Sequence, residues 1–299
     1  MKKNFLITGA KGQDGLILSD VLIKKGYKVF GLIKKKKYSN FVEKVKYLQS
    51  NLSNKKQVLK LLIDIKPDVI IHFGSTNPSF DERSKKNFFY NRNFLETKNL
   101  IDASLFTKRK ISFLFANSAK IIKKSKKKKL NEKSNLYDYN DYTKFRYGVL
   151  KYLKNIKKNN HFKFINLILF NHDSKFRNSK FLIPRIIKYI KNKDFGSLNE
   201  IYSQNISGDF SHAEDICNAI YLLIKKNKNI DNLILSSGKK TKINDIIKLL
   251  MKLSGLNYKF PLPKKSLNMS LGDNRLAKKI LRWKIKKNIY LAVKEIYKN

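Results

Sequence analysis

The stretch Asn4–Leu16 reads NFLITGAKGQDGL, and it decides the fold class. Residues 4–8 form an apolar run typical of a buried strand, and residues 16–25 have the pattern of a helix that ends at Gly26. Between strand and helix lie three glycines: Gly9, Gly12 and Gly15. Glycines in this context allow a tight turn, the approach of backbone N–H groups to a pyrophosphate, and close packing of helix on strand. The stretch therefore predicts a dinucleotide-binding turn, in preference to a plain strand–helix turn.

Short apolar strands alternate with helical segments over the first 170 residues. The further expected strands are residues 27–33, 69–73, 111–115 and 164–170, and the expected helices are residues 54–65, 88–105 and 142–157. Strands that are apolar along their whole length indicate a parallel sheet covered by helices on both faces. We therefore expect an α/β fold, with a doubly wound parallel sheet of the Rossmann type over residues 1–170.

After Phe170 the pattern changes to a polar, loop-rich stretch. The expected helices are residues 183–191, 215–226, 243–253, 277–281 and 289–297, with a strand at residues 232–236. We expect residues 171–299 to form a second, smaller α/β domain. Elements around residues 208–226 are expected to return to the first domain.

The chain is strongly basic. It has 299 residues, with 66 Lys and Arg against 22 Asp and Glu, so its formal net charge is +44. Such an excess can indicate a nucleic acid or an anionic membrane as partner. However, the lysines are spread between apolar residues along the chain, and no aromatic RNA-binding signature accompanies them. We expect no specific nucleic-acid partner and no membrane partner, only weak binding to polyanions at low salt.

Cysteine and histidine usage narrows the class further. The single cysteine, Cys217, excludes an intramolecular disulfide, and no apolar run approaches the ~20 residues that span a bilayer. These features favour a cytoplasmic protein. His72, His161 and His212 form no metal-ligand spacing with carboxylates or with Cys217, so no metal site is predicted.

The end of the second expected strand bears on the cofactor. An NAD site usually carries an acidic residue there, about 20 residues beyond the glycines, which holds the ribose diol. Here Ile33 is followed by four lysines, Lys34–Lys37, and by no acid. Cations suit a 2′-phosphate, so we predict NADP rather than NAD, with Lys34 among its contacts. The alternative is that these lysines form a solvated loop.

Six ordered motifs resemble the extended short-chain dehydrogenase/reductase family and, within it, the GDP-mannose 4,6-dehydratases. They are Ile7–Gly15 with its Gly-Gln-Asp-Gly sequence, Ser79–Phe80, Leu169–Ser174 with Arg177, Gly208–Asp215, Leu271–Asp273, and Leu281–Lys284. The resemblance covers nearly the whole chain. It implies cofactor contacts from Gly9, Gly12, Gln13, Asp14, Gly15, His172 and Arg177. It also implies that Asn171 contacts the substrate phosphates and that residues 171–299 bind the substrate.

The reaction that this resemblance implies converts GDP-mannose to GDP-4-dehydro-6-deoxymannose and water. It uses a tyrosinate, a lysine four residues later, a hydroxyl, and a glutamate that acts at C5 of the sugar. The matching positions are Tyr142, Arg146 in place of the lysine, Ser118, and Lys120 in place of the glutamate. Gly208 also stands where the family has an arginine.

The spacing of Tyr142 and Arg146 places both on one helical face. Arginine can favour a tyrosinate but cannot release a proton, and an ordinary lysine at position 120 is protonated and is no base. Tyr147 and Lys151 have the same spacing and form a second candidate pair.

These departures leave other functions open. A related 4-epimerase or keto-sugar reductase would need the hydroxyl, the tyrosine and a cation, but no glutamate. A noncatalytic paralogue with a degenerate site is a further alternative. The resemblance also implies a homodimer or homotetramer.

Overall fold

The computed structural model describes residues 2–33, 41–75, 86–123, 129–156, 161–263 and 265–299. The chain divides into two compact units. The first comprises Met1–Lys123, Glu132–Ile168 and Tyr221–Leu233; the second comprises Lys124–Asn131, Leu169–Ile220 and Ile234–Asn299. The sequence predicts a change of domain near residue 170, and it predicts that elements around residues 208–226 return to the first domain. In the structure the chain changes unit after Ile168, and the return is Tyr221–Leu233, later than expected.

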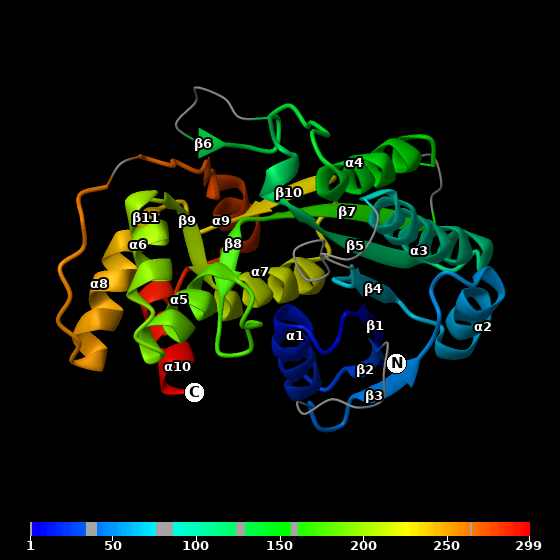
Figure 1. Cartoon of the computed structure of the whole chain (residues 1–299). Helices are drawn as coiled ribbons and strands as arrows, with labels where there is room; N and C mark the ends of the chain where they lie inside the picture. Colours follow the sequence, from blue (N-terminus) through cyan, green and yellow to red (C-terminus); the bar gives the residue numbers. More distant parts are fainter. Residues whose placement is uncertain (1, 34–40, 76–85, 124–128, 157–160, 264) are drawn as a thin grey trace. The chain divides into compact units, whose positions relative to one another are not determined.

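The first unit is built on a mostly parallel sheet. Its strands are β1 (Asn4–Thr8), β2 (Lys28–Ile33), β3 (Lys46–Gln49), β4 (Val69–His72), β5 (Ile111–Ser118), β7 (Phe162–Leu169) and β10 (Asn232–Leu235). They lie in the order β10-β7-β5-β4-β1-β2-β3 (Figure 1). β1 pairs in parallel with both β2 and β4. The strand order therefore runs in opposite directions on the two sides of β1, and this is the switch point of the sheet. Ligands of such sheets bind outside the carboxyl ends of the strands at this reversal.

Four helices of the described residues lie wholly within this unit. They are α1 (Gln13–Lys24), α2 (Lys55–Ile65), α3 (Lys86–Phe106) and α4 (Asp141–Lys154). α3 packs against α2 and against α4, and the core between sheet and helices includes Phe113, Phe115 and Phe145. α2 ends at Lys66 in the left-handed conformation, immediately before Pro67. The expected Rossmann-type, doubly wound sheet is confirmed.

The second unit is a smaller α/β assembly. Its three-stranded sheet has the order β11-β9-β8, from β8 (Asn171–Asp173), β9 (Ser207–His212) and β11 (Lys240–Lys242). A second, two-stranded sheet pairs β6 (Lys129–Leu130) with β12 (Leu271–Gly272). The helices are α5 (Leu182–Lys191), α6 (Phe195–Ser203), α7 (Ala213–Lys226), α8 (Ile243–Ser254), α9 (Arg275–Leu281) and α10 (Ile289–Lys298). α7 begins in this unit and ends in the first.

β9 was not predicted, and its composition explains why. All six of its residues are buried, but four of them are polar: Ser207, Asp209, Ser211 and His212. Phe210 is the only large apolar residue of this strand, so no apolar run is present and the usual signal of a buried strand is absent.

Candidate active site

The glycine turn leaves no room for side chains at two positions. Gly9 has a φ of +67°, and a Cβ there would lie 2.9 Å from the backbone nitrogen of Gly74. A Cβ on Gly15 would lie 2.4 Å from the carbonyl oxygen of Gly9. These two glycines therefore allow the left-handed turn and the close contact between helix and turn.

The start of α1 is shaped to receive an anion. Gly12 precedes the helix, and no side chain caps its first turn. The first amides of a helix have no partner within it, and their positive end favours a negative group. A pyrophosphate would fit this uncapped turn. Gln13 and Asp14 lie in the first turn, with Gln13 Nε2 donating to Asp14 Oδ1 at 3.2 Å. The cofactor contacts assigned to the turn stay predictions.

A buried histidine, His72, hydrogen-bonds with the residue before the glycine turn. The Gly74 N–H donates to Thr8 Oγ1 at 2.9 Å, and Thr8 Oγ1 lies 2.6 Å from His72 Nδ1. His72 Nε2 lies 3.0 Å from Thr97 Oγ1 on α3. His72 therefore joins β1, β4 and α3 through hydrogen bonds and has a structural role.

A lysine of the glycine turn lies close to two aromatic rings. Lys11 Nζ is 3.0 Å from the ring centroid of Phe41 and 4.2 Å from that of Tyr47. Tyr47 belongs to β3, which pairs with β2. Burial lowers the pKa of Lys11. Lys34 lies outside the described residues. Lys11 is a cation that the structure places between the glycine turn and β3. This contact has no signal in the sequence, because only the fold brings residues 11, 41 and 47 together.

Ser118 ends β5, and its surroundings hold it in place. Its Oγ accepts from the Lys120 N–H at 3.2 Å and so begins the 3-10 turn Ala119–Ile121. The Ser118 N–H donates to Asn117 Oδ1 at 2.8 Å. Asn117 Nδ2 donates to Asn166 Oδ1 at 2.9 Å, and Asn166 Nδ2 donates to Asn232 Oδ1 at 2.8 Å. This chain of amides from β5 through β7 to β10 was not foreseen from the sequence. The capping bond occupies Ser118 Oγ as an acceptor and leaves its O–H able to donate.

Tyr142 is the second residue of α4, whose start is fixed by a capping box of Asn140 and Thr143. The Ser118 hydroxyl and the side chains of Arg146 and Lys120 lie around its phenol. Burial raises the pKa of the phenol. The charge of Arg146, the hydrogen bond with Ser118 and the charge of Lys120 outweigh that effect, so the pKa of Tyr142 is below its ordinary value.

Arg146 lies one turn after Tyr142 and is 6% exposed. Its Nη1 donates to the Ala116 carbonyl oxygen at 2.8 Å, and its Nη2 donates to Ser75 Oγ at 3.3 Å. The guanidinium carbon is 4.6 Å from the Tyr142 ring centroid. The fixed charge is thus anchored to β5 and directed at the phenol, as the spacing of four residues suggested.

Lys120 is the second cation beside the phenol. Its Nζ lies 5.5 Å from the Tyr142 ring centroid, and its side chain is exposed. The structure therefore brings together all four residues predicted to be catalytic: Ser118, Lys120, Tyr142 and Arg146. In the other candidate pair, Lys151 Nζ lies 4.7 Å from the Tyr147 ring centroid.

The remaining predicted contacts belong to the second unit. The ring of His172 is buried, with Nδ1 2.6 Å from the Phe170 carbonyl oxygen, so Nδ1 carries a proton and donates. Asn171 Nδ2 donates to the Asp209 carbonyl oxygen at 3.3 Å. Arg177 Nε lies 2.9 Å from Asp173 Oδ1. The roles of Asn171, His172 and Arg177 toward cofactor and substrate stay predictions.

Gly208 stands where the related family has an arginine. A Cβ there would lie 2.8 Å from Met269 Cε, so Met269 occupies the space beside this backbone. A larger side chain at position 208 would have to displace Met269.

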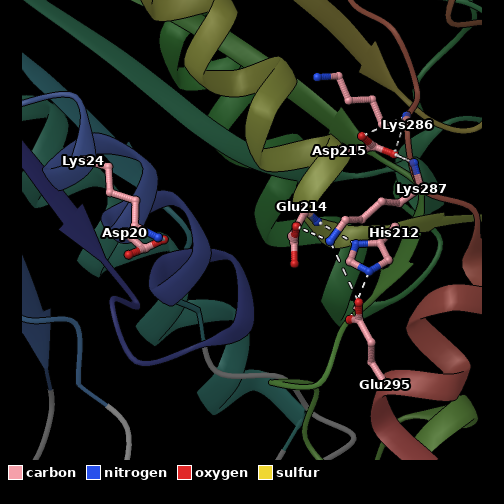
Figure 2. A network of polar contacts seen from close by, with 8 residues as sticks. All are labelled: Asp20, Lys24, His212, Glu214, Asp215, Lys286, Lys287 and Glu295. Carbon is pink, nitrogen blue, oxygen red and sulfur yellow. Dashed lines mark hydrogen bonds and ion pairs between the residues drawn. The ribbon is translucent and has the colours of Figure 1, made fainter.

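The sequence shows no metal-ligand spacing around His212, but the fold brings two carboxylates beside it. Glu214 and Glu295 lie beside it, with the three potential ligand atoms within 4.8 Å of one another (Figure 2). The Glu214 N–H donates to His212 Nδ1 at 3.2 Å, and His212 Nε2 lies 3.1 Å from Glu295 Oε2. Lys287 Nζ is 2.7 Å from Glu214 Oε2 and 3.9 Å from Glu295 Oε1. The lysine ammonium thus takes the place that a cation would need between the carboxylates. The prediction of no metal stays a prediction.

None of the described helices combines the length and the apolar character that crossing a membrane requires.

Comparison with known proteins places the chain in a family. A GDP-mannose 4,6 dehydratase from Dictyostelium discoideum is 24% identical over 339 residues, covering 99% of this chain and 95% of that protein. The UDP-Glc/GlcNAc 4-epimerase of Campylobacter jejuni has a similar structure, with a TM-score of 0.83, 20% identity, and coverage of 99% of this chain and 98% of that chain. The structure of UDP-glucuronic acid 4-epimerase from Bacillus cereus, solved in complex with NAD, is also similar. Its TM-score is 0.80 and its sequence identity is 18%, with coverage of 99% of this chain and 97% of that chain. The model of the family described as GDP-mannose 4,6 dehydratase matches residues 6–296. The chain therefore belongs to the GDP-mannose 4,6 dehydratase family.

Proposed function

We propose that the protein is an NADP-dependent enzyme that oxidises the 4-hydroxyl of a nucleotide-linked sugar. The observation that carries the proposal is the group around Tyr142. A phenol whose pKa is lowered lies beside the Ser118 hydroxyl and against the buried, fixed charge of Arg146. A lowered pKa makes the phenolate form available at lower pH, which suits a phenol that accepts a proton.

The residues of the chain have distinct tasks in this reaction. A nicotinamide dinucleotide bound at the glycine turn would supply the hydride acceptor. The Tyr142 phenolate takes the proton of the sugar hydroxyl, and the Ser118 O–H donates to the same sugar oxygen. Arg146 stabilises the phenolate electrostatically and does not itself release a proton.

The choice of NADP rests on the end of β2 and on Lys11. β2 ends at Ile33, and no acid stands among Gly31, Leu32 and Ile33 to hold a ribose diol. Lys11 adds a cation beside β3. In Lys11→Met we expect the affinity for NADP to fall about tenfold, because one charge-assisted contact to the 2′-phosphate is lost. The affinity for NAD should change little.

Fluorescence titration of both nucleotides checks this prediction. Lys24→Met is the matched control, since Lys24 is exposed and pairs with Asp20 at 2.7 Å on α1. Equal losses for NADP and NAD in Lys11→Met would show that the lysine supports the turn and does not select the cofactor.

GDP-mannose 4,6-dehydration is the first reaction to test, because the family model covers most of the chain. A 4-epimerase or keto-sugar reductase is the second candidate, and Lys120 favours it. The dehydratase reaction draws on a carboxylate at that position for C5, and the structure places an ammonium group against the phenol instead. Epimerisation and keto reduction need no such base.

The test is incubation with NADP and GDP-mannose, followed by a panel of other sugar nucleotides. Dehydration gives a product lighter by one water, with near-ultraviolet absorbance in alkali. Epimerisation leaves the mass unchanged and alters the configuration at C4, which NMR detects. Binding of sugar nucleotides without any turnover would indicate a noncatalytic paralogue. Restoration of dehydration by Lys120→Glu with Arg146→Lys would then identify a decayed dehydratase site. The absence of both binding and turnover would reject the proposal.

The homodimer or homotetramer also stays part of the proposal, and sedimentation equilibrium tests it.

A further inference from the structure

Three asparagine side chains form a continuous row of hydrogen bonds within the main sheet of the first unit. Asn117 lies on β5, Asn166 on β7 and Asn232 at the start of β10, and these strands are neighbours in the sheet. We call these three residues the amide chain. Asn117 is 3% exposed and Asn166 is 1% exposed. Asn166 lies between the buried apolar residues Ile165 and Leu167, so an amide at this place needs its own explanation.

Every link of the amide chain has the same direction. Asn166 Nδ2 donates to Asn232 Oδ1 at 2.8 Å, and Asn117 Nδ2 donates to Asn166 Oδ1 at 2.9 Å. Asn117 Oδ1 in turn accepts from the Ser118 N–H at 2.8 Å. The amide chain therefore ends on the backbone of the residue that carries the predicted catalytic hydroxyl. Hydrogen bonds in such a row polarise one another, and a buried row with every link made holds its members in one arrangement.

Stability alone gives a weak reason for burying these amides. Burial of an amide costs free energy that its hydrogen bonds roughly offset, and apolar side chains of the same shape can be as stable in its place. Removal of a single member is different, because its neighbours are then buried without partners. What the amide chain contributes is therefore a fixed geometry, and this geometry is imposed on the end of β5.

The end of β5 is held at three consecutive residues. The Ala116 carbonyl oxygen accepts from Arg146 Nη1 at 2.8 Å, and the Asn117 side chain belongs to the amide chain. Ser118 Oγ accepts from the Lys120 N–H at 3.2 Å. Successive side chains of a strand point to opposite faces of the sheet, so Asn117 is anchored on one face while Ser118 is presented on the other.

We infer that Asn117, Asn166 and Asn232 are positioning residues, which fix the end of β5 so that the Ser118 O–H meets the oxygen whose proton Tyr142 accepts. This inference rests on the proposed function and adds no covalent step to it. Displacement of a catalytic group by about 1 Å can lower a rate about 10²-fold. Asn166 is the most informative member, because its amide reaches Ser118 through Asn117.

The experiment is a double-mutant cycle of Asn166→Leu and Ser118→Ala, assayed with NADP and the sugar nucleotide that the protein turns over, with GDP-mannose tried first. Asn166→Leu keeps the branched shape of the side chain and removes its donor and its acceptor. We expect this variant to lower kcat about 10–10²-fold with NADP affinity unchanged, and to have no further effect once Ser118 is alanine. A general structural loss would instead multiply with that of Ser118→Ala, so independent effects overturn the inference.

Asn99→Leu is the matched control. Asn99 is 2% exposed on α3 of the same unit, and its Nδ2 donates to the Leu52 carbonyl oxygen at 2.9 Å. This variant should lose stability, as Asn166→Leu does, but keep the wild-type kcat. Thermal unfolding and NADP titration show which variants fold.

Asn232→Ala tests the amide chain at its half-buried end, where the loss of one acceptor endangers folding least. It should lower kcat in the same way as Asn166→Leu but by a smaller factor, and only while Ser118 is present. A wild-type kcat in both variants overturns the inference.

Amide hydrogen exchange gives a second reading that does not require turnover. The Ser118 N–H is bonded to Asn117 Oδ1, so its exchange should be at least ~10-fold faster in Asn166→Leu than in wild type, and unchanged in Asn99→Leu. Unchanged exchange in Asn166→Leu overturns the inference. If Ser118→Ala lowers kcat and the asparagine variants do not, only the inference fails. If no sugar nucleotide is bound or turned over, the proposed function fails, and the inference fails with it.

Discussion

The Tyr142 phenol is the group on which the proposed chemistry depends most directly. In Tyr142→Phe the ring that faces Phe145 is kept and the proton acceptor is lost. We expect kcat to fall about 10²–10⁴-fold, the usual contribution of a general base, with NADP affinity unchanged. Steady-state kinetics and NADP titration check this. Tyr147→Phe tests the second candidate pair, and a larger loss in Tyr147→Phe than in Tyr142→Phe would move the catalytic role to Tyr147.

Arg146 determines the pH at which this phenol can act. Burial raises the pKa of Tyr142, while the charge of Arg146 lowers it and is the largest of the opposing effects. The active form is the phenolate, so activity rises as pH increases through that pKa. In Arg146→Gln the lowering effect is lost, and we expect the rising limb of the pH–kcat/KM profile to move to higher pH.

The conservative variant supplies the control for this shift. Arg146→Lys keeps a positive charge near the phenol, so its rising limb should lie closer to that of the wild-type protein. An identical profile in wild type and Arg146→Gln would mean that a group other than Tyr142 titrates in the rate.

The conformation of the turn between β1 and α1 requires a residue without a side chain at position 15. A Cβ on Gly15 would lie 2.4 Å from the Gly9 carbonyl oxygen and 2.6 Å from Ala10 Cα, both backbone atoms of the turn. We therefore expect Gly15→Ala to lower the free energy of unfolding by about 1–3 kcal/mol and to abolish NADP binding. Chemical denaturation and NADP titration measure the two effects.

Gly196 in α6 provides a matched substitution. A Cβ there would meet nothing closer than Asp194 Oδ1, at 3.7 Å, so Gly196→Ala should bind NADP normally and be as stable as wild type or more so. NADP binding at wild-type affinity in Gly15→Ala would show that the turn is not the cofactor site.

β9 is a buried strand that is held in place by polar contacts, above all those of Asp209. Burial raises the pKa of the Asp209 carboxyl, against the lowering effect of its hydrogen bonds. Asp209 accepts from the N–H and Oγ–H of Ser237, and from the N–H groups of Gly238 and Gly272. The Asp209 carboxylate thus binds the loop after β10, through Ser237 and Gly238, and the strand β12, through Gly272. No local sequence pattern identifies such a residue, because its partners lie at least 28 residues away.

Across the molecule, the parts that were predicted are those with a local signal. Six strands of the main sheet were predicted from mainly apolar segments, whereas β3, with the sequence KYLQ, was not. α2 ends just before Pro67, as predicted. Ser118, Lys120, Tyr142 and Arg146 were identified by their resemblance to family motifs. The parts that were missed depend on distant residues. Glu295 reaches His212 from 83 positions away, and Lys11 meets Tyr47 only because β3 pairs with β2.

The net charge of +44 gives a prediction about the whole molecule that separates incidental from specific binding. Lysines such as Lys55, Lys56 and Lys60 on α2 are exposed and spread along the helix, so a duplex DNA would neutralise many charges at once. Affinity for DNA should then fall steeply with salt, about 10³–10⁵-fold between 50 and 200 mM, and be negligible at physiological ionic strength. NADP carries few charges, so its affinity should fall much less over the same range. Fluorescence anisotropy of labelled duplex DNA and NADP titration measure the two slopes. DNA binding that persists at physiological salt with a sequence preference would contradict the view that the basic surface is incidental, and would give the lysines a function of their own.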